Sequence, residues 1–468
     1  MPAADELTPD RLAAALAPAA GRRLWIAYSG GLDSHVLLHA AAGLRRELRL
    51  DLRAVHIHHG LQPAADDWAR HCAQVCGGLG VALEIRRVAP QPGSGSGSGS
   101  GPEAAAREAR YGAFRALLRP GAMLATAQHR DDQAETLLLA LLRGAGVHGL
   151  AAMPPQAPLG AGTLLRPLLD LPRAALAAYA QAEGLRWVED PSNRDPMLDR
   201  NRLRHLVVPE LRQRWPLLDK TLSRSAAHCA EAAGLLDELA DELLAGLGAG
   251  TAGAEGLPVA LSVAGLRRLA GPKQRLVLRR WLGRRGFPLP DTQRLRRITA
   301  ELLPAAADRQ PLVAWPGCEV RRHRDALHAL APLPPPPAGP LLPAPGACAL
   351  ALPGPLGALS WGLDPALGRT REPTVANARI SVQFAAAGLR CARLARPSAD
   401  LKAVFQEAGI PAWLRPYVPL LVLDDRLAGV GGVRLCGGGL AWLRWQGHPW
   451  AAQGWLVTHL ENTHIDSR

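Results

Sequence analysis

The stretch that decides the fold is Leu24-Trp-Ile-Ala-Tyr-Ser-Gly-Gly-Leu-Asp-Ser34. Its apolar first half predicts a buried strand, and the run from Asp33 to Leu48 has the spacing of an amphipathic helix. The two glycines form the turn between them. Such a turn gathers backbone N–H groups and the positive end of the helix dipole at one point, which favours an anion. A plain turn capped by Ser34 or Asp33 is the alternative, and the complete string after a strand argues against it.

The same alternation continues along the first two hundred residues. Apolar runs predict further strands, and amphipathic runs predict helices between them. The strands are expected at 52–57, 81–88 and 123–127, and the helices at 65–76, 103–118 and 131–142. Repeated strand–helix–strand crossovers predict an α/β fold with a doubly wound parallel sheet. The glycine–serine repeat at 93–101 has the composition of a flexible insert.

Length and composition predict three folded domains in the 468 residues. After Trp215 the pattern becomes helical and rich in alanine and leucine, and eight prolines lie between Pro332 and Pro345. A stiff spacer fits such a proline-rich segment. The predicted divisions are an α/β domain at 1–216, a helical basic middle domain at 217–331, a proline-rich linker at 332–366 and a small α+β domain at 367–468.

The charge balance points to a polyanionic partner. The chain has 54 basic and 41 acidic residues, a net charge of +13. Only three basic residues are lysine, and the excess of arginine with alanine, glycine and proline also fits a bias in genome composition. The segment 267–297 carries eleven basic residues against one acid. A solvated helix face is the alternative there, but the asymmetry of sign favours a surface for a phosphate backbone.

Cysteine usage and hydropathy predict a reducing, cytoplasmic setting. Seven scattered cysteines without a Cys-x-x-Cys pair disfavour a disulfide framework and a zinc ribbon. Asp5, Glu6 and Asp10 stand where a signal peptide would be basic. The uncharged stretches 144–165 and 326–363 are interrupted by proline and glycine, so we expect no membrane helix.

Two common phosphate loops are excluded. A Walker loop needs a lysine, and the first lysine of the chain is Lys220; Gly-x-Gly-x-x-Gly is also absent at this turn. The string at 29–34 resembles instead the PP-loop of the N-type ATP pyrophosphatases, which split ATP into AMP and pyrophosphate. The resemblance implies that ATP is bound by Ser29, Gly30, Gly31, Leu32, Asp33 and Ser34. Because a carboxylate only accepts, Asp33 suits an accompanying Mg²⁺ ion.

The second predicted strand ends in Val55-His-Ile-His-His-Gly60, which resembles the loop of that superfamily near the adenine. The resemblance places His56 at the nucleotide. A metal site made of His56, His58 and His59 is a weaker alternative, because successive residues of a strand face opposite sides.

Polar residues also follow the fourth predicted strand. Asp132 and Glu135, three residues apart, place two carboxylates on one helix face at the carboxyl edge of the sheet, where ligands bind. They can hold an amino group or a magnesium ion. Acids that only complement the helix dipole are the alternative. Many members of the superfamily carry His-His where this chain has Gln128-His129, so His129 is the imidazole that remains.

Arg107 and Arg110 lie on one face of the helix predicted at 103–118. They suit a pyrophosphate or an RNA phosphate. A pairing of Glu103 with Arg107 inside the helix explains them equally well, and both readings stay open.

Later strings narrow the resemblance. In order after the PP-loop come Leu165-Arg-Pro-Leu-Leu169, Val188-Glu-Asp-Pro-Ser-Asn193 and Arg200-Asn-Arg-Leu-Arg-His205. Together they resemble the tRNA(Ile)-lysidine synthetase family, and the stretch 396–420 resembles the RNA-contact domain of that family. The middle domain matches only in position and basic, helical character. Trp413 is expected in the core rather than as a stacking platform for a base.

The resemblance implies an enzyme that uses ATP and Mg²⁺ to join free L-lysine to C2 of the wobble cytidine of a CAU-anticodon tRNA(Ile), through an adenylated cytidine. The catalytic residues that it implies are Asp33, Arg110, His129, Asp132 and Glu135, with Asp33 and Asp132 as metal ligands and His56 and Arg166 at the nucleotide. The tRNA contacts that it implies are Arg107, Arg200, Asn201, Arg204, Arg279, Arg280, Lys402 and Arg415. Which carboxylate acts as base stays open, as does the choice between a monomer and a homodimer.

Two other functions are alternatives to this one. A tRNA thiolase on the same scaffold needs paired cysteines, and Cys72 and Cys76 have the wrong spacing. A non-catalytic RNA-binding protein with a decayed nucleotide fold is the third reading. Intact Asp33, Asp132 and Glu135 argue against such decay.

Overall fold

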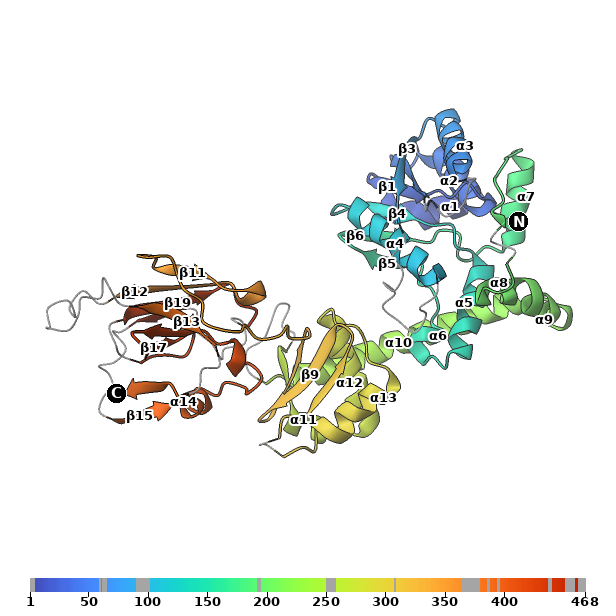
Figure 1. Ribbon diagram of the computed structural model, residues 1–468. Coiled ribbons are helices and arrows are strands. Elements are labelled where there is room, and N and C mark those ends of the chain that lie inside the picture. Colours follow the sequence, from blue (N-terminus) through green and yellow to red (C-terminus); the bar gives the residue numbers. More distant parts are fainter. Residues whose placement is uncertain are drawn as a thin grey trace. The chain divides into compact units, whose positions relative to one another are not determined.

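The computed structural model describes residues 5–58, 60, 65–89, 102–191, 195–249, 258–306, 309–363, 379–384, 388–393, 396–436, 440–450 and 459–461. The chain forms two compact units, Met1–Leu236 and Asp237–Arg468, and each is described by itself (Figure 1). The predicted insert at 93–101, His59 and Asn193 lie outside the described residues.

A six-stranded sheet forms the centre of the first unit (Figure 1). Its order is β3 (Ala82–Arg87), β2 (Asp51–His58), β1 (Arg23–Ala27), β4 (Met123–Ala125), β6 (Gly162–Leu165) and β5 (Gln156–Leu159). All neighbouring strands pair in parallel except β5, which is an antiparallel edge strand on β6. The predicted doubly wound sheet is confirmed, with the β5–β6 hairpin as an addition.

The strand order reverses at β1. Strands β2 and β3 follow on one side of it, whereas β4 pairs with its other side. Ligands of open α/β sheets bind at such a switch point, outside the carboxyl ends of the strands. The residues that follow β1 and those that follow β4 are therefore brought to the same crevice.

Helices cover both faces of this sheet. On one face, α1 (Pro9–Leu16), α2 (Leu32–Leu44), α3 (Ala65–Gly78) and α7 (Arg173–Ala182) share a core with Leu24 and Ile26 of β1. On the other face, α4 (Pro102–Leu117) packs Phe114 into a core with Trp25. Alternate residues of β1 thus reach opposite cores, as the pleat requires. The unit also contains α5 (Arg130–Leu142), α6 (Val147–Leu150), α8 (Asp199–Arg202), the π-helical turn η3 (Leu203–Val207) and α9 (Val208–Arg214).

The predicted middle domain contains more than helices. Its helical pattern is confirmed by α10 (Leu218–Ala245), α11 (Val263–Arg267), α12 (Gly271–Arg284), α13 (Thr292–Arg297) and the π-helical turn η5 (Ile298–Leu302). These helices share a core with an antiparallel sheet in the order β7 (Ala260–Ser262), β10 (Ala326–Leu330), β9 (Cys318–His323) and β8 (Leu312–Trp315). The sequence pattern did not reveal this sheet, because its strands are short and lie between stronger helical signals.

Antiparallel sheets build the C-terminal part. One has the order β11 (Ala349–Ala351), β12 (Ala358–Leu363), β19 (Leu440–Gln446) and β20 (His459–Glu461). Another has the order β13 (Ile380–Gln383), β16 (Leu420–Leu423), β17 (Arg426–Val430) and β18 (Arg434–Leu435). The hairpin of β14 (Arg390–Arg393) and β15 (Arg396–Asp400) leads into α14 (Leu401–Glu407). An α+β arrangement is confirmed.

Two expectations for this part need correction. The predicted linker at 332–366 is too long, because β11 and β12 lie within it and Leu359 and Trp361 are buried in the C-terminal core. The prolines around these short strands hid their alternation. Cys391 and Cys436, although 45 residues apart, form a disulfide that cysteine spacing did not reveal. Trp413 lies in the same core at 8% exposure, as predicted.

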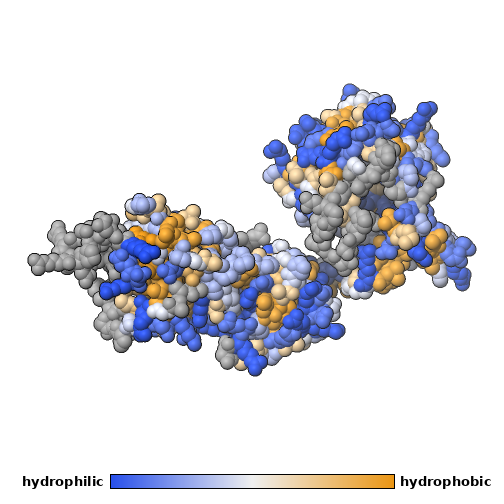
Figure 2. Space-filling model, viewed as in Figure 1, coloured by the Kyte–Doolittle hydropathy of each residue, from blue (hydrophilic) through white to orange (hydrophobic). Residues whose placement is uncertain are grey.

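The hydropathy of the helices and of the surface concerns two further predictions, a homodimer and the absence of a membrane helix. Within the part of the chain that the structure describes, no helix combines the length and apolar character needed to cross a membrane. The visible face of both units is mainly hydrophilic, with smaller hydrophobic patches (Figure 2). Large apolar side chains exposed in the first unit include those of Leu141, Leu142, Leu206, Trp215 and Leu217. A homodimer stays a prediction, and these side chains are apolar surface available to it.

Candidate active site

The loop after β1 is a preformed anion cradle. Gly30 has a φ of +87°, and a Cβ there would lie 3.2 Å from Cys72 Sγ, so a side chain at Gly30 would be strained. The hydroxyl of Ser34 donates to the carbonyl of Gly31 at 3.0 Å, and the hydroxyls of Ser29 and Ser34 lie 3.0 Å apart. Helix α2 starts here without a side-chain cap, which leaves its first N–H groups to an anion.

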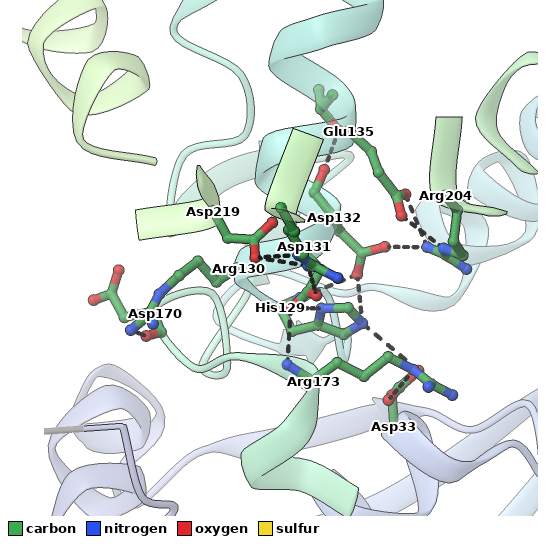
Figure 3. A network of polar contacts seen from close by, with 12 residues as sticks. Asp33, His129, Arg130, Asp131, Asp132, Glu135, Asp170, Arg173, Arg204 and Asp219 are labelled. Carbon is green, nitrogen blue, oxygen red and sulfur yellow. Dashed lines mark hydrogen bonds and ion pairs between the residues drawn. The ribbon is translucent and has the colours of Figure 1, made fainter. Parts of the chain in front are cut away.

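His129 joins the PP-loop to the segment after β4 (Figure 3). Its imidazole is 2% exposed, with Nε2 3.8 Å from Asp33 and 3.3 Å from Asp132, and Nδ1 3.5 Å from Asp131. Burial opposes a charge on the ring, but the three carboxylates outweigh burial and raise the pKa of His129. Leu32 anchors the adjacent loop in the core. The predicted residues Asp33, His129 and Asp132 therefore form one cluster at the switch point.

Helix termini explain why these groups converge. His129 is the N-cap residue of α5, and Asp132 accepts its backbone N–H at 3.1 Å, as in a capping box. Asp131 accepts the backbone N–H of Arg173 at 2.8 Å, at the first residue of α7. The N-termini of α5 and α7 are thus tied together beside the PP-loop.

Two arginines predicted to bind RNA pair instead with the predicted catalytic carboxylates. Arg204 donates to the two oxygens of Glu135 at 2.6 and 2.8 Å and to Asp132 at 2.9 Å. Arg200 donates to Glu135 at 2.9 Å. Burial lowers the pKa of Arg204, but its pairs with Glu135, Asp132 and Asp33 outweigh burial and raise it. The sequence predicted an RNA-binding role for the two arginines and a catalytic role for Glu135, because 65 and 69 residues separate Glu135 from them and their pairing is not visible in the sequence.

This network changes what Glu135 can do. Its side chain is 3% exposed, and both of its oxygens accept hydrogen bonds from arginines. A nearly buried carboxylate held by two arginines has little access to a further ligand. Asp132 is more accessible, at 13% exposed, and lies next to His129. Asp132 is therefore the better candidate to meet a substrate amine.

Asp33 and Asp132, the two predicted metal ligands, differ in how far their oxygens are already engaged. Oδ1 of Asp33 is buried and accepts no hydrogen bond from the described residues. Burial raises the pKa of Asp33, against the opposing effects of His129 and Arg173. Among the described residues no group of three or more His, Cys, Asp or Glu could hold a metal ion. Asp33 fits a Mg²⁺ that takes its other ligands from phosphate and water. Asp132 fits it less well, because its oxygens already accept hydrogen bonds.

A second cationic group lies at α4 and the end of β6. Arg166 is 8% exposed and donates to the carbonyl of Pro154 at 2.6 Å, and its Nε is buried without a hydrogen-bond partner among the described residues. Burial lowers the pKa of Arg166, Tyr111 opposes that shift and Arg107 adds to it. The guanidinium of Arg107 lies 4.9 Å from the centre of the Tyr111 ring. Both Arg107 and Arg110 are exposed, so this group can receive an anion.

The alternative for Arg107 was an internal pair with Glu103. The side chain of Glu103 lies outside the described residues. The contact of Arg107 with Tyr111 is a packing role that neither reading included.

His56 is packed at the end of β2. Its ring is 5% exposed, and Nδ1 donates to the carbonyl of Tyr28 at 3.0 Å and lies 3.5 Å from Cys72 Sγ. Burial lowers the pKa of His56, so its neutral form is favoured. His58 pairs with Asp66 at 3.1 Å. These contacts hold the end of β2 against the loop after β1 and against α3, and a contact of His56 with the nucleotide stays a prediction.

Among the predicted RNA contacts, Arg280 and Asn201 have structural partners. Arg280 donates to Asp237 at 2.8 Å and to Asp241 at 2.7 and 2.9 Å. The side chain of Asn201 is 7% exposed and donates to the carbonyl of Asp195 at 2.9 Å. Their assignment as RNA contacts stays a prediction, and the internal contacts show that both side chains also have a structural role.

The remaining predicted RNA contacts differ in exposure. Arg415 is half-buried and donates to the carbonyl of Ile410 at 3.2 Å, and burial lowers its pKa. Arg279 donates to the carbonyl of Pro290 at 3.3 Å. Lys402 is exposed on α14. The basic segment also presents exposed cations that were not singled out, namely Arg267, Arg268, Lys273, Arg275 and Arg296.

The structure adds three residues to the site. Asp131 accepts from Arg212 at 2.5 Å, and Arg212 also donates to Asp219 at 2.9 Å. Arg173 lies beside Asp33 (Figure 3). Only Asp131, adjacent to Asp132 in a helix start, offered a signal in the sequence. The arginines lie on later helices and reach the site only through the fold.

Comparisons with known proteins agree with this architecture. Family profiles match the PP-loop domain at residues 5–211, the TilS substrate binding domain at 261–328 and the TilS substrate C-terminal domain at 380–450. A U34-tRNA thiolase from Methanococcus maripaludis superposes on 48% of this chain and 77% of its own with a TM-score of 0.40 and 16% identity, which carries no argument about function.

Curated relatives extend over nearly the whole chain, and those described here are each named tRNA(Ile)-lysidine synthase. The relative from Methylococcus capsulatus is 47% identical over 439 residues, which are 91% of this chain and 94% of its own. The relative from Coxiella burnetii is 42% identical over 92% of both chains. The relative from Alkalilimnicola ehrlichii is 44% identical over 92% of this chain and 94% of its own. The chain belongs to the tRNA(Ile)-lysidine synthase family of PP-loop enzymes.

Proposed function

We propose that the protein joins free L-lysine to C2 of the wobble cytidine in a CAU-anticodon tRNA(Ile), while ATP is cleaved to AMP and pyrophosphate. The observation that carries the proposal is the cluster in which Asp33 of the PP-loop meets His129 and Asp132 at the switch point of the sheet. Membership of a family named for lysidine formation supports the substrate assignment. The cytoplasm, where tRNA is modified, is the compartment proposed for this reaction.

In the first step, the C2 carbonyl oxygen of the cytidine attacks the α-phosphorus of ATP, and the bond to the bridging oxygen of the β-phosphate breaks. Negative charge develops on the phosphate oxygens, where preorganised donors are most effective. The N–H groups of the PP-loop and of the first turn of α2 supply such donors. A Mg²⁺ ion at Asp33 would add neutralising charge. Arg107 and Arg166 are the cationic groups proposed nearby.

In the second step, the lysine ε-amine forms a bond to C2, and AMP leaves with the C2 oxygen. The amine must first lose a proton, and its ordinary pKa is about 10.4. Arg200, Arg204 and the charged His129 create cationic surroundings, which favour the neutral amine. We assign Asp132 to orient this amine and accept its proton, and Glu135 to hold the two arginines.

The raised pKa of His129 limits its role. The raised pKa favours the protonated ring, so we assign His129 to neutralise Asp33, Asp131 and Asp132 rather than to act as a base. It thereby keeps three carboxylates close together without mutual repulsion. Arg110 is exposed on α4 and stays a proposed contact for the substrate.

Recognition of tRNA is assigned to the regions after residue 216. We propose that exposed cations at 267–297, together with Lys402, bind phosphates of the RNA. A wobble cytidine lies in a single-stranded loop and can be splayed into the crevice. This leaves the first domain, 1–216, for catalysis.

Incubation of the full chain with MgCl₂, ATP, labelled lysine and unmodified CAU-anticodon tRNA(Ile) tests the proposal. We expect label in the tRNA together with AMP and pyrophosphate. The same tRNA with a UAU anticodon is the matched control and should receive no label. Sulfur transfer, or tRNA binding without lysine transfer, would refute the proposed function.

The thiolase alternative finds no support in the site. Cys72 and Cys76 are buried, and burial raises the pKa of their thiols to about 12 and about 11. Sulfur chemistry requires a thiolate that a substrate can reach. These two cysteines serve as core residues.

A further inference from the structure

Arg173 differs from the other arginines around the carboxylate cluster. Arg130, Arg200, Arg204 and Arg212 each donate side-chain hydrogen bonds to carboxylates, at 2.5 to 2.9 Å. The guanidinium of Arg173 makes an ion pair with Asp33 at 3.7 Å and, among the described residues, no hydrogen bond. Its side chain is 53% exposed. Within the described cluster, Arg173 is thus the arginine whose donors are still open to a ligand.

The backbone of Arg173 is nevertheless fixed. It is the first residue of α7, after Pro172, and its N–H donates to Asp131 at 2.8 Å. A side chain on this anchored position can move between nearby partners without a change in the main chain. In Figure 3 it points toward Asp33.

Asp33 is the carboxylate with which the Arg173 guanidinium pairs in the described cluster. Oδ1 of Asp33 is buried without a hydrogen bond from the described residues, so a cation can take it. If Asp33 held a Mg²⁺ ion, the guanidinium of Arg173 would have to share this carboxylate with a second cation. A phosphate would then be a favourable partner, because the planar guanidinium can donate two parallel N–H groups to it.

We propose that Arg173 binds phosphate oxygens of the nucleotide and moves to them from Asp33 when ATP enters with its metal ion. The inference rests on the proposed function in taking ATP as the substrate. It assigns a nucleotide contact to a residue outside the PP-loop. Because Arg173 is the first residue of α7, this contact would link the N-terminus of α7 to the bound nucleotide.

Calorimetric titration of the full chain with ATP and MgCl₂, without tRNA or lysine, tests the proposal. Arg173→Gln should weaken ATP binding about 10- to 100-fold, as expected for loss of hydrogen bonds between charged groups. Arg173→Lys should recover part of the affinity. Arg143→Gln is the matched control, because Arg143 is 62% exposed and forms a similarly long ion pair, 3.6 Å from Asp199. It should bind ATP like the wild type.

Pyrophosphate and adenosine separate a phosphate contact from a structural role. Arg173→Gln should lose affinity for pyrophosphate by a similar factor and keep its affinity for adenosine. Unchanged ATP binding, or equal losses for ATP and adenosine, would overturn the proposal. If the wild type binds ATP but transfers no lysine, the proposed function fails while the Arg173 result stands. If it transfers lysine and Arg173→Gln binds ATP normally, only the Arg173 proposal fails.

Discussion

Arg204 donates to both carboxylate oxygens of Glu135, at 2.6 and 2.8 Å. Two parallel, charge-assisted hydrogen bonds make this one of the stronger forms of ion pair. The pair joins α5, the helix after β4, to the turn η3. Glu135 therefore acts by positioning the arginines that face Asp132.

Glu135→Gln should destabilise the protein by about 2 kcal/mol, because two partly buried arginines lose their charged partner. Urea unfolding measures this change. Asp199→Asn is the control, since Asp199 is 75% exposed in its pair with Arg143, and should cost less than about 0.5 kcal/mol. A combined Glu135→Gln and Arg204→Met variant should be less unstable than the sum of the single changes. Strict additivity would contradict a direct coupling.

Asp33→Asn should separate stability from activity. Burial raises the pKa of Asp33 above its ordinary value of 3.8. The buried carboxylate charge lowers the free energy of unfolding. This destabilisation is absent below pH 3.8, where the carboxyl is protonated in both states, and is complete once the pH exceeds the raised pKa. At pH 7 the variant should unfold at the same temperature as the wild type or higher, and should form AMP in response to tRNA about 100-fold more slowly. Retained AMP formation would remove Asp33 from its assigned metal role.

His129→Gln should show a pH-dependent loss of stability. Because the folded protein raises the pKa of His129 above 6.5, the ring contributes stability in full below that pH. The contribution is lost as the pH rises through the raised pKa. The difference in unfolding free energy between wild type and variant should therefore be larger at pH 6 than at pH 9. A difference that is independent of pH would mean that His129 contributes by packing alone.

Charge reversal at Lys273 and Arg275, both exposed on α12, should weaken tRNA binding. The slope of log affinity against log salt concentration should decrease by about 2, one unit for each phosphate contact. Filter binding at several salt concentrations measures this slope. Equal affinity and slope would assign this part of the segment to an ordinary solvated surface.

Arg280→Glu serves as a contrasting variant. It would place a third acid beside Asp237 and Asp241, which now hold Arg280. We expect lower thermal stability from this change, because like charges at this distance repel. The basic segment thus contains cations that pair with acidic residues of the same unit, such as Arg280, and exposed cations, such as Lys273 and Arg275. Composition alone did not distinguish the two kinds.

Local pattern was sufficient for much of the α/β fold. The first strand, the glycine turn and the helix predicted from Asp33 to Leu48 correspond to β1 and α2, because apolar periodicity is a property of neighbouring residues. The rule that ligands gather at the carboxyl ends of strands placed Asp132 and Glu135 at the edge of the sheet, whereas His129 was indicated by the family resemblance. The sheet β7–β10 was not predicted, because its order depends on pairing between distant segments.

The sequence by itself predicted the glycine turn, the alternation of strands and helices and the polar residues that follow the strands, because each depends on short-range periodicity. Only the tertiary structure decided which charges meet. Glu135 pairs with Arg204 across 69 residues, Asp131 with Arg212 across 81, and Arg280 with Asp241 across 39. A charged residue type indicates that a partner is needed, but the choice of partner depends on which side chains the packed helices bring within hydrogen-bond distance.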